Sequence, residues 1–442
     1  MDYVLNRNYG NSISRCNKKV VWILAISLLC IAVGVVTTPY LSLIAFFLFG
    51  FSLLVLQPED ILVLLFGLLP FANIFKLSPT SMSCFTLCEI SAVIWLLLRC
   101  RKIRVSQFLV ILCLVAYMLI FSFENSNVFT IFKLCINCFI IVISVSTFTK
   151  EGFTKSIRLL AISTIVMMIL SSNVRYLEYV EKYFTDLDYY VDSTGLMTDT
   201  LRISGFFGDP NYCAVLIILV LSALCVLYYY KSIGVDFWIY VLFLVPLGFL
   251  TYSKSYFLCM IIWAVALIFF VLLPKHKCWA GISIIAVGFV FYLAYNGKIE
   301  AINMVIERFN HGDITTGRTE LNKQYLQYIF DNGKVLLFGD GVTADRFVGA
   351  RNNVHCLYIE MLYKLGILGS LLYCGTMMSL LPSMKVRTER HFVNYLPLIF
   401  FLLMFAFLAA VVNYALPFYI ALVYLTFNYA SLDSFGSKEV LQ

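Results

Sequence analysis

The stretch RISGFFGDPNYCAVLIILVLSALCVLYYY, residues 202 to 230, passes from a polar segment into a long run of apolar residues. A helix needs about 20 apolar residues to cross the hydrocarbon core of a bilayer, and residues 210–230 supply such a run. Asp209 is a good N-cap, and Pro210 suits the first helical turn, where a missing N–H costs nothing. The stretch therefore predicts a membrane-spanning helix that begins at residue 210, with polar groups just outside its start.

The chain as a whole is far more apolar than a soluble protein. Of its 442 residues, 61% are hydrophobic and 13% are charged, and the mean hydropathy is +0.89. This composition predicts an all-α polytopic membrane protein with about 12 to 14 transmembrane helices. The candidate spans are fourteen apolar windows: 20–37, 40–57, 60–76, 85–99, 107–123, 128–147, 157–171, 210–230, 235–250, 255–273, 278–296, 355–381, 394–413 and 416–431.

The basic residues predict the orientation of these spans. Lys and Arg in short loops stay on the cytoplasmic side of a membrane, and in the fourteen-span arrangement most of them fall on one side. We assign that side, with both termini, to the cytoplasm. Because topology accounts for these charges, no nucleic-acid partner is expected. The residues are Arg7, Arg15, Lys18, Lys19, Arg99, Arg101, Lys102, Arg104, Lys150, Lys155, Arg158, Lys275, Lys277, Lys385, Arg387 and Arg390.

Two long polar segments interrupt the apolar windows and divide the chain into five regions. In the second segment, the spacing of apolar residues predicts a helix over 319–330, closed by Asn332 and Gly333, and FGDGV at 338–342 is a glycine turn. The regions are N-terminal transmembrane helices (1–171), a first large extracytoplasmic loop (172–209), central transmembrane helices (210–296), a second large and partly helical extracytoplasmic loop (297–354), and C-terminal transmembrane helices with a short cytoplasmic tail (355–442).

Arginines in the two outer loops are not required by topology. Arg202, Arg318 and Arg351 are examples, and a guanidinium matches phosphate with two parallel hydrogen bonds. Gly205 and Gly208 allow the backbone beside Arg202 to turn and to approach a ligand closely. From residues 202–214 alone, Arg202 fits equally well as an anchor at the membrane surface.

Charged residues inside the windows are interpreted as structural pairs. Glu89 and Lys133 are expected at similar depth in the membrane, where an unpaired charge is costly. Glu360 and Lys364 share one helix face at i,i+4.

Five short motifs follow one another between residues 200 and 370: RISGFFGDPN from 202, SKS at 253–255, GR at 317–318, GDG at 339–341 and HCLYIEMLYKLGILG from 355. In order and placement this set resembles the O-antigen polymerase and ligase superfamily of bacterial membrane glycosyltransferases. The chain departs from that pattern twice. Lys254 stands in place of an arginine, and Cys356 stands in place of the asparagine after the histidine.

The resemblance implies a metal-independent glycosyltransferase without a cofactor, whose site lies on the extracytoplasmic face of the bacterial cytoplasmic membrane. Its donor would be a glycan on undecaprenyl diphosphate, and cations stabilise the charge of the departing diphosphate. The implied catalytic residues are His355, Arg318 and Arg202, with His355 as base, acceptor-positioning group or diphosphate contact. The implied substrate-binding residues are Lys254, Asp209, Asn211 and Arg351.

We predict a polymerase of lipid-linked oligosaccharide repeat units for a capsule, an exopolysaccharide or an O-antigen. Its expected partners are the lipid-linked donor and acceptor, the lipid bilayer, a chain-length regulator and a flippase. A ligase that moves a finished glycan onto lipid A core or another acceptor is the near alternative. A transporter or flippase of the lipid-linked sugar is the alternative from another class, and it predicts inverted repeats, broken helices and charge at mid-membrane.

Overall fold

The computed structural model describes residues 5–37, 39–73, 83–99, 105–121, 128–172, 202–207, 209–275, 277–299, 302–306, 317–350, 352–381, 391–408, 411 and 413–434. Within these ranges the chain is helical and contains no β-strand, so the predicted all-α class is confirmed. Gly208, Arg351 and most of the predicted loop 172–209 lie outside the described residues.

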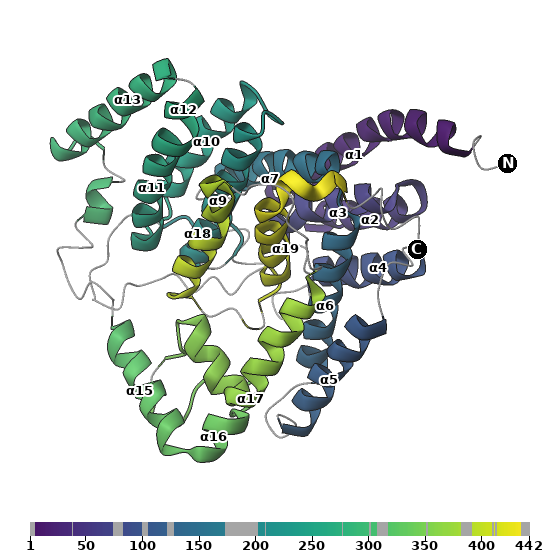
Figure 1. Cartoon of the computed structure of the whole chain (residues 1–442), viewed down its shortest axis with the longest axis vertical. Helices are drawn as coiled ribbons and strands as arrows, with labels where there is room; N and C mark the ends of the chain where they lie inside the picture. The colour runs from purple at the N-terminus through teal and green to yellow at the C-terminus, as the bar shows by residue number, and fades with distance from the viewer. Residues whose placement is uncertain are drawn as a thin grey trace.

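Each of the fourteen predicted windows contains a helix in the described part of the chain (Figure 1). These helices are α1 Leu5–Val36, α2 Ser42–Val55, α3 Pro58–Leu68, α4 Cys84–Arg99, α5 Val105–Phe121, α6 Val128–Thr147, α7 Lys150–Ser171, α9 Pro210–Tyr229, α10 Asp236–Phe249, α11 Lys254–Ala266, α13 Lys277–Tyr295, α17 Leu357–Leu380, α18 Leu396–Phe405 and α19 Leu416–Phe427. A π-helix, η3 Leu267–Leu272, prolongs α11 toward the short α12 Leu273–Lys275, and the second polar segment forms α15 Arg318–Asp331 and α16 Gly333–Phe338.

Five helices in the described ranges are long and apolar enough to cross a membrane, which is typical of a polytopic membrane protein. They cover Phe129–Thr147, Lys150–Ser171, Pro210–Tyr229, Lys254–Leu272 and Leu357–Leu380. Several others are shorter. The predicted total of 12 to 14 spans therefore stays a prediction.

Helix α18 shows why one predicted span is shorter than its window. It has 10 residues, or about 15 Å of the roughly 30 Å that a hydrocarbon core requires. The chain then leaves the helix, and the backbone N–H of Val411 donates to Glu360 Oε2 at 3.0 Å. The apolar window 394–413 is therefore not one continuous helix. Backbone outside a helix needs an internal hydrogen-bond partner within a membrane, and Glu360 provides one for Val411.

Helix α9, the helix predicted from residues 210–230, lies at the centre of the bundle (Figure 1). It contacts α7, α10, α11, α18 and α19, and 83% of its most apolar stretch is buried. A helix that is hydrophobic on every side is expected to be surrounded by other helices. Asp209 is its N-cap, with Oδ1 accepting from the backbone N–H of Asn211 at 2.7 Å, and Pro210 is its first residue, as predicted.

The two ends of α9 belong to different neighbourhoods. Near its start, segment 202–207 meets the turn between α10 and α11, where the N–H of Ile203 donates to the carbonyl of Leu250 at 3.0 Å. We call this the loop end of the bundle. Beyond its C-terminus, the carbonyl of Ser232 accepts from Arg158 Nη2 at 3.5 Å. We call the region of residues 149–158 and 230–236 the basic end. The 20 residues of α9 separate the two by about 30 Å.

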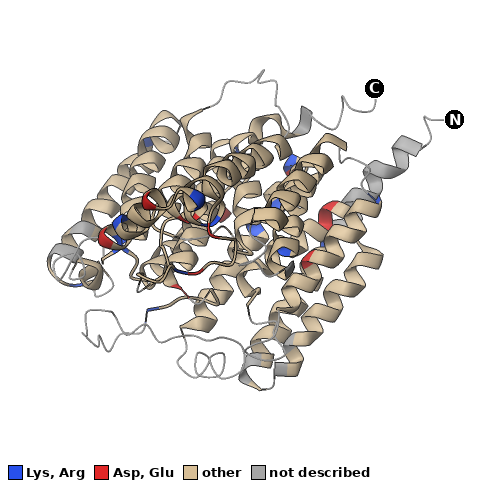
Figure 2. Ribbon diagram, turned by 90° about the horizontal axis from the view of Figure 1, so that it is seen from below, with Lys and Arg blue, Asp and Glu red and all other residues tan. Residues whose placement is uncertain are grey.

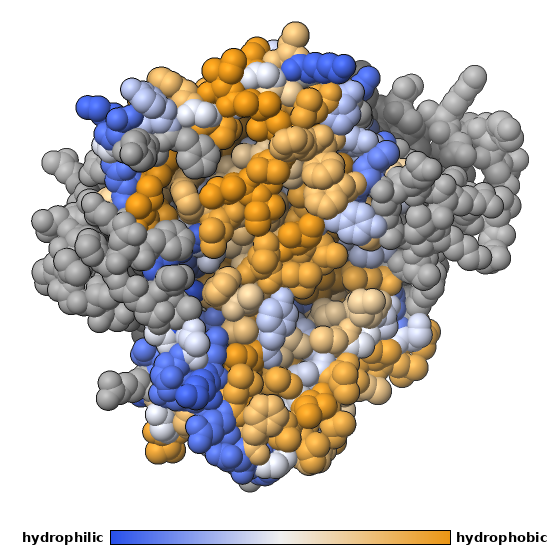
Figure 3. All heavy atoms as spheres, turned by 60° about the vertical axis from the view of Figure 1, so that its left-hand side comes forward, coloured by the Kyte–Doolittle hydropathy of each residue, from blue (hydrophilic) through white to orange (hydrophobic). Residues whose placement is uncertain are grey.

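The surface is consistent with a lipid environment. Figure 2 shows that Lys, Arg, Asp and Glu are sparse along the helices. Figure 3 shows a broad apolar area in the middle of one face, with hydrophilic residues gathered along its lower left. Large apolar side chains are exposed on α10, α11 and α13, among them Leu242, Leu258 and Ile285. Soluble monomers rarely expose apolar patches of this extent.

Candidate functional site at the loop end of the bundle

Segment 202–207 is held against the turn that joins α10 to α11. Arg202 Nε donates to the carbonyl of Thr251 at 3.2 Å, next to the backbone bond between Ile203 and Leu250. Gly205 has φ +58°, and a Cβ at this position would lie 2.8 Å from the sulfur of Met167. The left-handed backbone at this position favours glycine, as predicted, and the hydrogen bond from Nε places the Arg202 head group beside the turn.

The caps of α9 and α11 are joined by one chain of hydrogen bonds. Asp209 Oδ1 accepts from Asn211 Nδ2 at 2.9 Å, which orients the amide, and Asn211 Oδ1 then accepts from Ser253 Oγ at 2.9 Å. Ser253 Oγ also accepts from the N–H of Tyr256 at 3.3 Å and so caps α11. The predicted residues Asp209 and Asn211 thus meet the SKS motif directly.

This arrangement creates an electropositive corner. Two helix N-termini, those of α9 and α11, are held together, and each carries the positive end of a helix dipole. The Asp209 carboxylate offsets the dipole of α9, so the positive charge of the corner comes mainly from two side chains. Lys254 is the first residue of α11, and Arg202 lies beside the same turn. Such a corner favours a phosphate or diphosphate anion.

Arg318, which belongs to the second polar segment, also lies at the loop end. Gly317 has φ +76° and precedes α15, so that Arg318 is the first residue of that helix. Arg318 Nη1 donates to the carbonyl of Phe407, just after α18, at 3.1 Å. Helix α15 matches the helix predicted over 319–330, and one arm of the Arg318 guanidinium attaches its start to the end of α18.

His355 brings three predicted site residues into one electrostatic neighbourhood. It lies two residues before α17 and is half-buried. Burial lowers the pKa of His355, the nearby Arg318 guanidinium lowers it further, and Asp209 and Glu360 oppose the shift. The lowered pKa favours the neutral imidazole, which is able to accept a proton. His355, Arg318 and Asp209 come from distant parts of the sequence.

The two glycine motifs pack against each other and position α15 and α16. The N–H of Asp340 donates to the carbonyl of Tyr363 at 2.8 Å. Gly366 interrupts α17 with φ +66°, and a Cβ there would lie 2.5 Å from the carbonyl oxygen of Leu337. Figure 1 shows α15, α16 and α17 together at its lower edge. The glycine turn at 339–341 was predicted, whereas the kink in α17 was not.

Polar side chains from other parts of the chain pack against segment 202–207. Asn73 Nδ2 donates to the carbonyl of Phe206 at 2.8 Å and to the hydroxyl of Tyr414 at 3.1 Å. Lys133 Nζ lies 5.7 Å from the centre of the Tyr414 ring. Glu89 is fully buried, and neither of its carboxyl oxygens accepts a hydrogen bond from a described residue. Lys133 acts on Glu89 electrostatically, so the predicted pair shares one neighbourhood without a hydrogen bond.

Sequence reasoning assigned the other charged pair correctly and missed three contributors. Lys364 Nζ and Glu360 Oε1 are 2.9 Å apart, which confirms the predicted i,i+4 pair. Glu360, Ser253 and Thr251 received no role in the site. A serine before an apolar helical run is an N-cap signal, so the role of Ser253 was available from the sequence. No described residues form a group of three or more His, Cys, Asp or Glu side chains suited to a metal ion.

Comparison of the chain with protein-family models, with curated proteins and with solved structures finds no match. The motif residues and their arrangement at the loop end are therefore what bears on function.

Proposed function

We propose that the chain is a membrane glycosyltransferase that polymerises oligosaccharide repeat units carried on undecaprenyl diphosphate. The observation that supports this most is the convergence of His355, Arg318 and Asp209 on one electrostatic neighbourhood. A proton acceptor beside a permanent cation suits a reaction in which a hydroxyl is deprotonated while an anion departs.

The electropositive corner provides the donor site in this proposal. The diphosphate lies against the N-termini of α9 and α11, where Arg202, Lys254 and Arg318 supply positive charge. Negative charge on the diphosphate grows as its bond to the sugar breaks, so fixed cations stabilise the transition state more than the bound donor.

His355 acts as the base in the transfer step. The hydroxyl oxygen of the acceptor sugar attacks the anomeric carbon of the donor glycan, and the carbon–oxygen bond to the diphosphate breaks. The hydroxyl proton moves to the imidazole, and the electron pair of the broken bond leaves with undecaprenyl diphosphate. Asp209 and Glu360 favour the imidazolium that forms.

The distribution of cations supports an extracytoplasmic site. Lys150, Lys155 and Arg158 are at the basic end, which the positive-inside rule assigns to the cytoplasm. The loop end is about 30 Å away along α9, so the proposed site faces the other side of the bacterial cytoplasmic membrane.

Deletion of the gene, followed by analysis of lipid-linked glycans, tests this proposal. A polymerase predicts accumulation of single repeat units on the outer leaflet, with long chains restored by the wild-type gene. Long unattached chains would instead identify a ligase, and units that remain inward-facing would identify a flippase. An unchanged glycan profile would contradict all three.

A further inference from the structure

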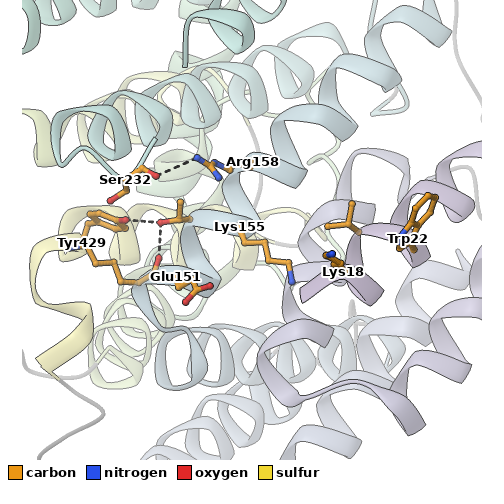
Figure 4. A pocket seen from close by; sticks show the side chains of 10 residues that line it. Lys18, Trp22, Glu151, Lys155, Arg158, Ser232 and Tyr429 are labelled. Atoms are coloured by element: carbon orange, nitrogen blue, oxygen red, sulfur yellow. Dashed lines mark hydrogen bonds between the residues drawn. The ribbon is translucent and has the colours of Figure 1, made fainter. Parts of the chain in front are cut away.

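A cavity of about 820 Å³ opens at the basic end of the bundle, far from the candidate site (Figure 4). It lies between α1 and the first turns of α7, and residues after α9 and α19 complete its wall. Four cations line it, with one acidic residue, Glu151. The cations are Lys18, Lys150, Lys155 and Arg158.

Two of these cations are held by carboxylates, and two are not. Lys155 Nζ lies 2.9 Å from Asp60, and Arg158 Nη2 lies 2.9 Å from Asp236. Lys18 and Lys150 make no ion pair with a carboxylate of the described residues. The cavity therefore has positive charge that its own walls do not neutralise.

Lys150 is placed by an aromatic side chain rather than by an acid. Its Nζ lies 5.2 Å from the centre of the Tyr429 ring, and the Tyr429 hydroxyl is 2.7 Å from Thr154 Oγ1. Tyr429 is fully buried, so neighbouring side chains surround its ring. A cation–π contact orders the ammonium group while leaving its charge available to an anion.

The α1 side of the cavity is amphipathic. Lys18 and Trp22 are four residues apart and share one helix face, and Trp22 is 67% exposed. Tryptophan is enriched at the head-group level of membranes, where its ring meets both acyl chains and water. Figure 4 shows Lys155 extending from α7 toward the side of Lys18.

A second cavity of about 790 Å³ adjoins the first and shares Arg158 and Ser232 with it. Its walls include Trp238 and Leu242, and Leu242 is 69% exposed. Arg158 therefore stands between a basic cavity and one whose walls are mostly apolar but include Lys231. A basic cavity beside a mostly apolar one suits an amphiphile, which has a charged head group and an apolar tail, better than it suits a small soluble anion.

We infer that the basic cavity binds the phosphate head group of an anionic phospholipid from the cytoplasmic leaflet. Lys18 and Lys150 contact the phosphate, Arg158 borders it, and the acyl chains lie along Trp22 and the exposed apolar side chains. Basic pockets between transmembrane helices on the cytoplasmic side suit such head groups. The inference is independent of the reaction proposed for the loop end.

Lipid titration of the full-length protein in detergent, followed by native mass spectrometry, tests this inference. The probes are phosphatidylglycerol and phosphatidylcholine with identical acyl chains. We expect tighter binding of phosphatidylglycerol, and a loss of about thirtyfold in its affinity in Lys18→Gln/Lys150→Gln. Lys18→Arg/Lys150→Arg should keep the affinity. Lys323→Gln/Lys334→Gln, which removes the same charge from α15 and α16, should leave it unchanged.

Three results would overturn the inference. They are equal affinity for the two lipids, equal losses in the cavity and control variants, and inorganic phosphate binding as tightly as phosphatidylglycerol, which would indicate a soluble anion. If the double variant is not monodisperse, Lys18→Glu decides the matter, because Lys18 is exposed and its reversal does not disturb packing. Affinity for phosphatidylglycerol should then fall about tenfold or more, and unchanged affinity would refute the site.

Discussion

Ser253 Oγ donates a 2.9 Å hydrogen bond to Asn211 Oδ1 and thereby joins the N-terminal caps of two helices. Ser253 caps α11, and Asp209, which orients Asn211, caps α9. One hydroxyl therefore controls how two positive helix ends lie relative to each other. The electropositive corner depends on this bond rather than on the presence of cations alone.

Ser253→Ala should lower both stability and turnover. The change removes the cap of α11 and leaves the part-buried Asn211 Oδ1 without its donor from Ser253, which together cost about 1 to 3 kcal/mol. The thermal midpoint in detergent and the polymer formed per folded molecule measure the two effects. Ser255→Ala, on the same helix, is the matched control and should resemble wild type. Equal behaviour of the two variants would show that the bond between caps has no role.

Gly366→Ala should destabilise the protein, whereas Gly375→Ala in the same helix should not. At Gly366 the backbone has φ +66° and a Cβ would lie 2.5 Å from the carbonyl oxygen of Leu337, while at Gly375 nothing lies within 4 Å. Strain at the first position costs about 1 to 3 kcal/mol, and alanine at the second stabilises a helix by about 0.5 to 1 kcal/mol. Thermal midpoints measured side by side should move in opposite directions.

Local elements of the fold could be predicted from the sequence because their causes are local. Apolar runs predicted a helix in every window, and the cap at Asp209 and the turn at Gly339 follow from residue type. The pairing of Asn211 with Ser253 and the kink at Gly366 could not be predicted, since they depend on which helices pack together. Periodicity does not contain that information.

The length of helices was the other point that composition could not decide. Window 394–413 is largely apolar, yet α18 ends at Phe405, and a carboxylate on α17 accepts from the backbone N–H of Val411 beyond it. That partner is 51 positions away in the chain. The structure places Arg202, Asp209, Asn211, Arg318 and His355 at the loop end, and their assignment as site residues stays a prediction.

Arg318→Lys should lose most of the turnover although the charge is kept. A guanidinium can bond the carbonyl of Phe407 with one arm and present its other N–H groups to a phosphate, which a point ammonium cannot do. Polymer formed per inserted molecule is the measurement. Arg346→Lys, at an exposed position in the same polar segment, is the control. Product near the wild-type amount in Arg318→Lys would reduce Arg318 to an anchor of α15.

Cysteine labelling tests the orientation of the loop end. Lys323 is exposed on α15, so Lys323→Cys should react with a membrane-impermeant maleimide on intact spheroplasts, above the background of the wild-type chain. Lys18→Cys, in the wall of the basic cavity, should react only after lysis. The reverse pattern would place the proposed site in the cytoplasm, where it could not meet an outer-leaflet glycan.

His355→Gln tests the base and has a distinctive dependence on pH. Because the pKa of His355 is lowered from its ordinary value of 6.5 in the folded protein, the unfolded chain binds a proton at higher pH than the folded chain does. Stability is therefore full above about pH 6.5 and falls as the pH drops toward the lowered value. The variant should show a shallower loss over that range in thermal unfolding.

The pH dependence of turnover should also reflect the titration of His355. In the wild type turnover should decline on the acid side with a midpoint below 6.5, since only the neutral imidazole accepts a proton. In His355→Gln turnover should fall by about 10²-fold, the usual scale for one general base, and the acid limb should disappear. Binding of the lipid-linked donor should change little, because the diphosphate is assigned to Arg202, Lys254 and Arg318. A histidine that only caps the start of α17 would lower the thermal midpoint and leave both turnover per folded molecule and its pH profile intact.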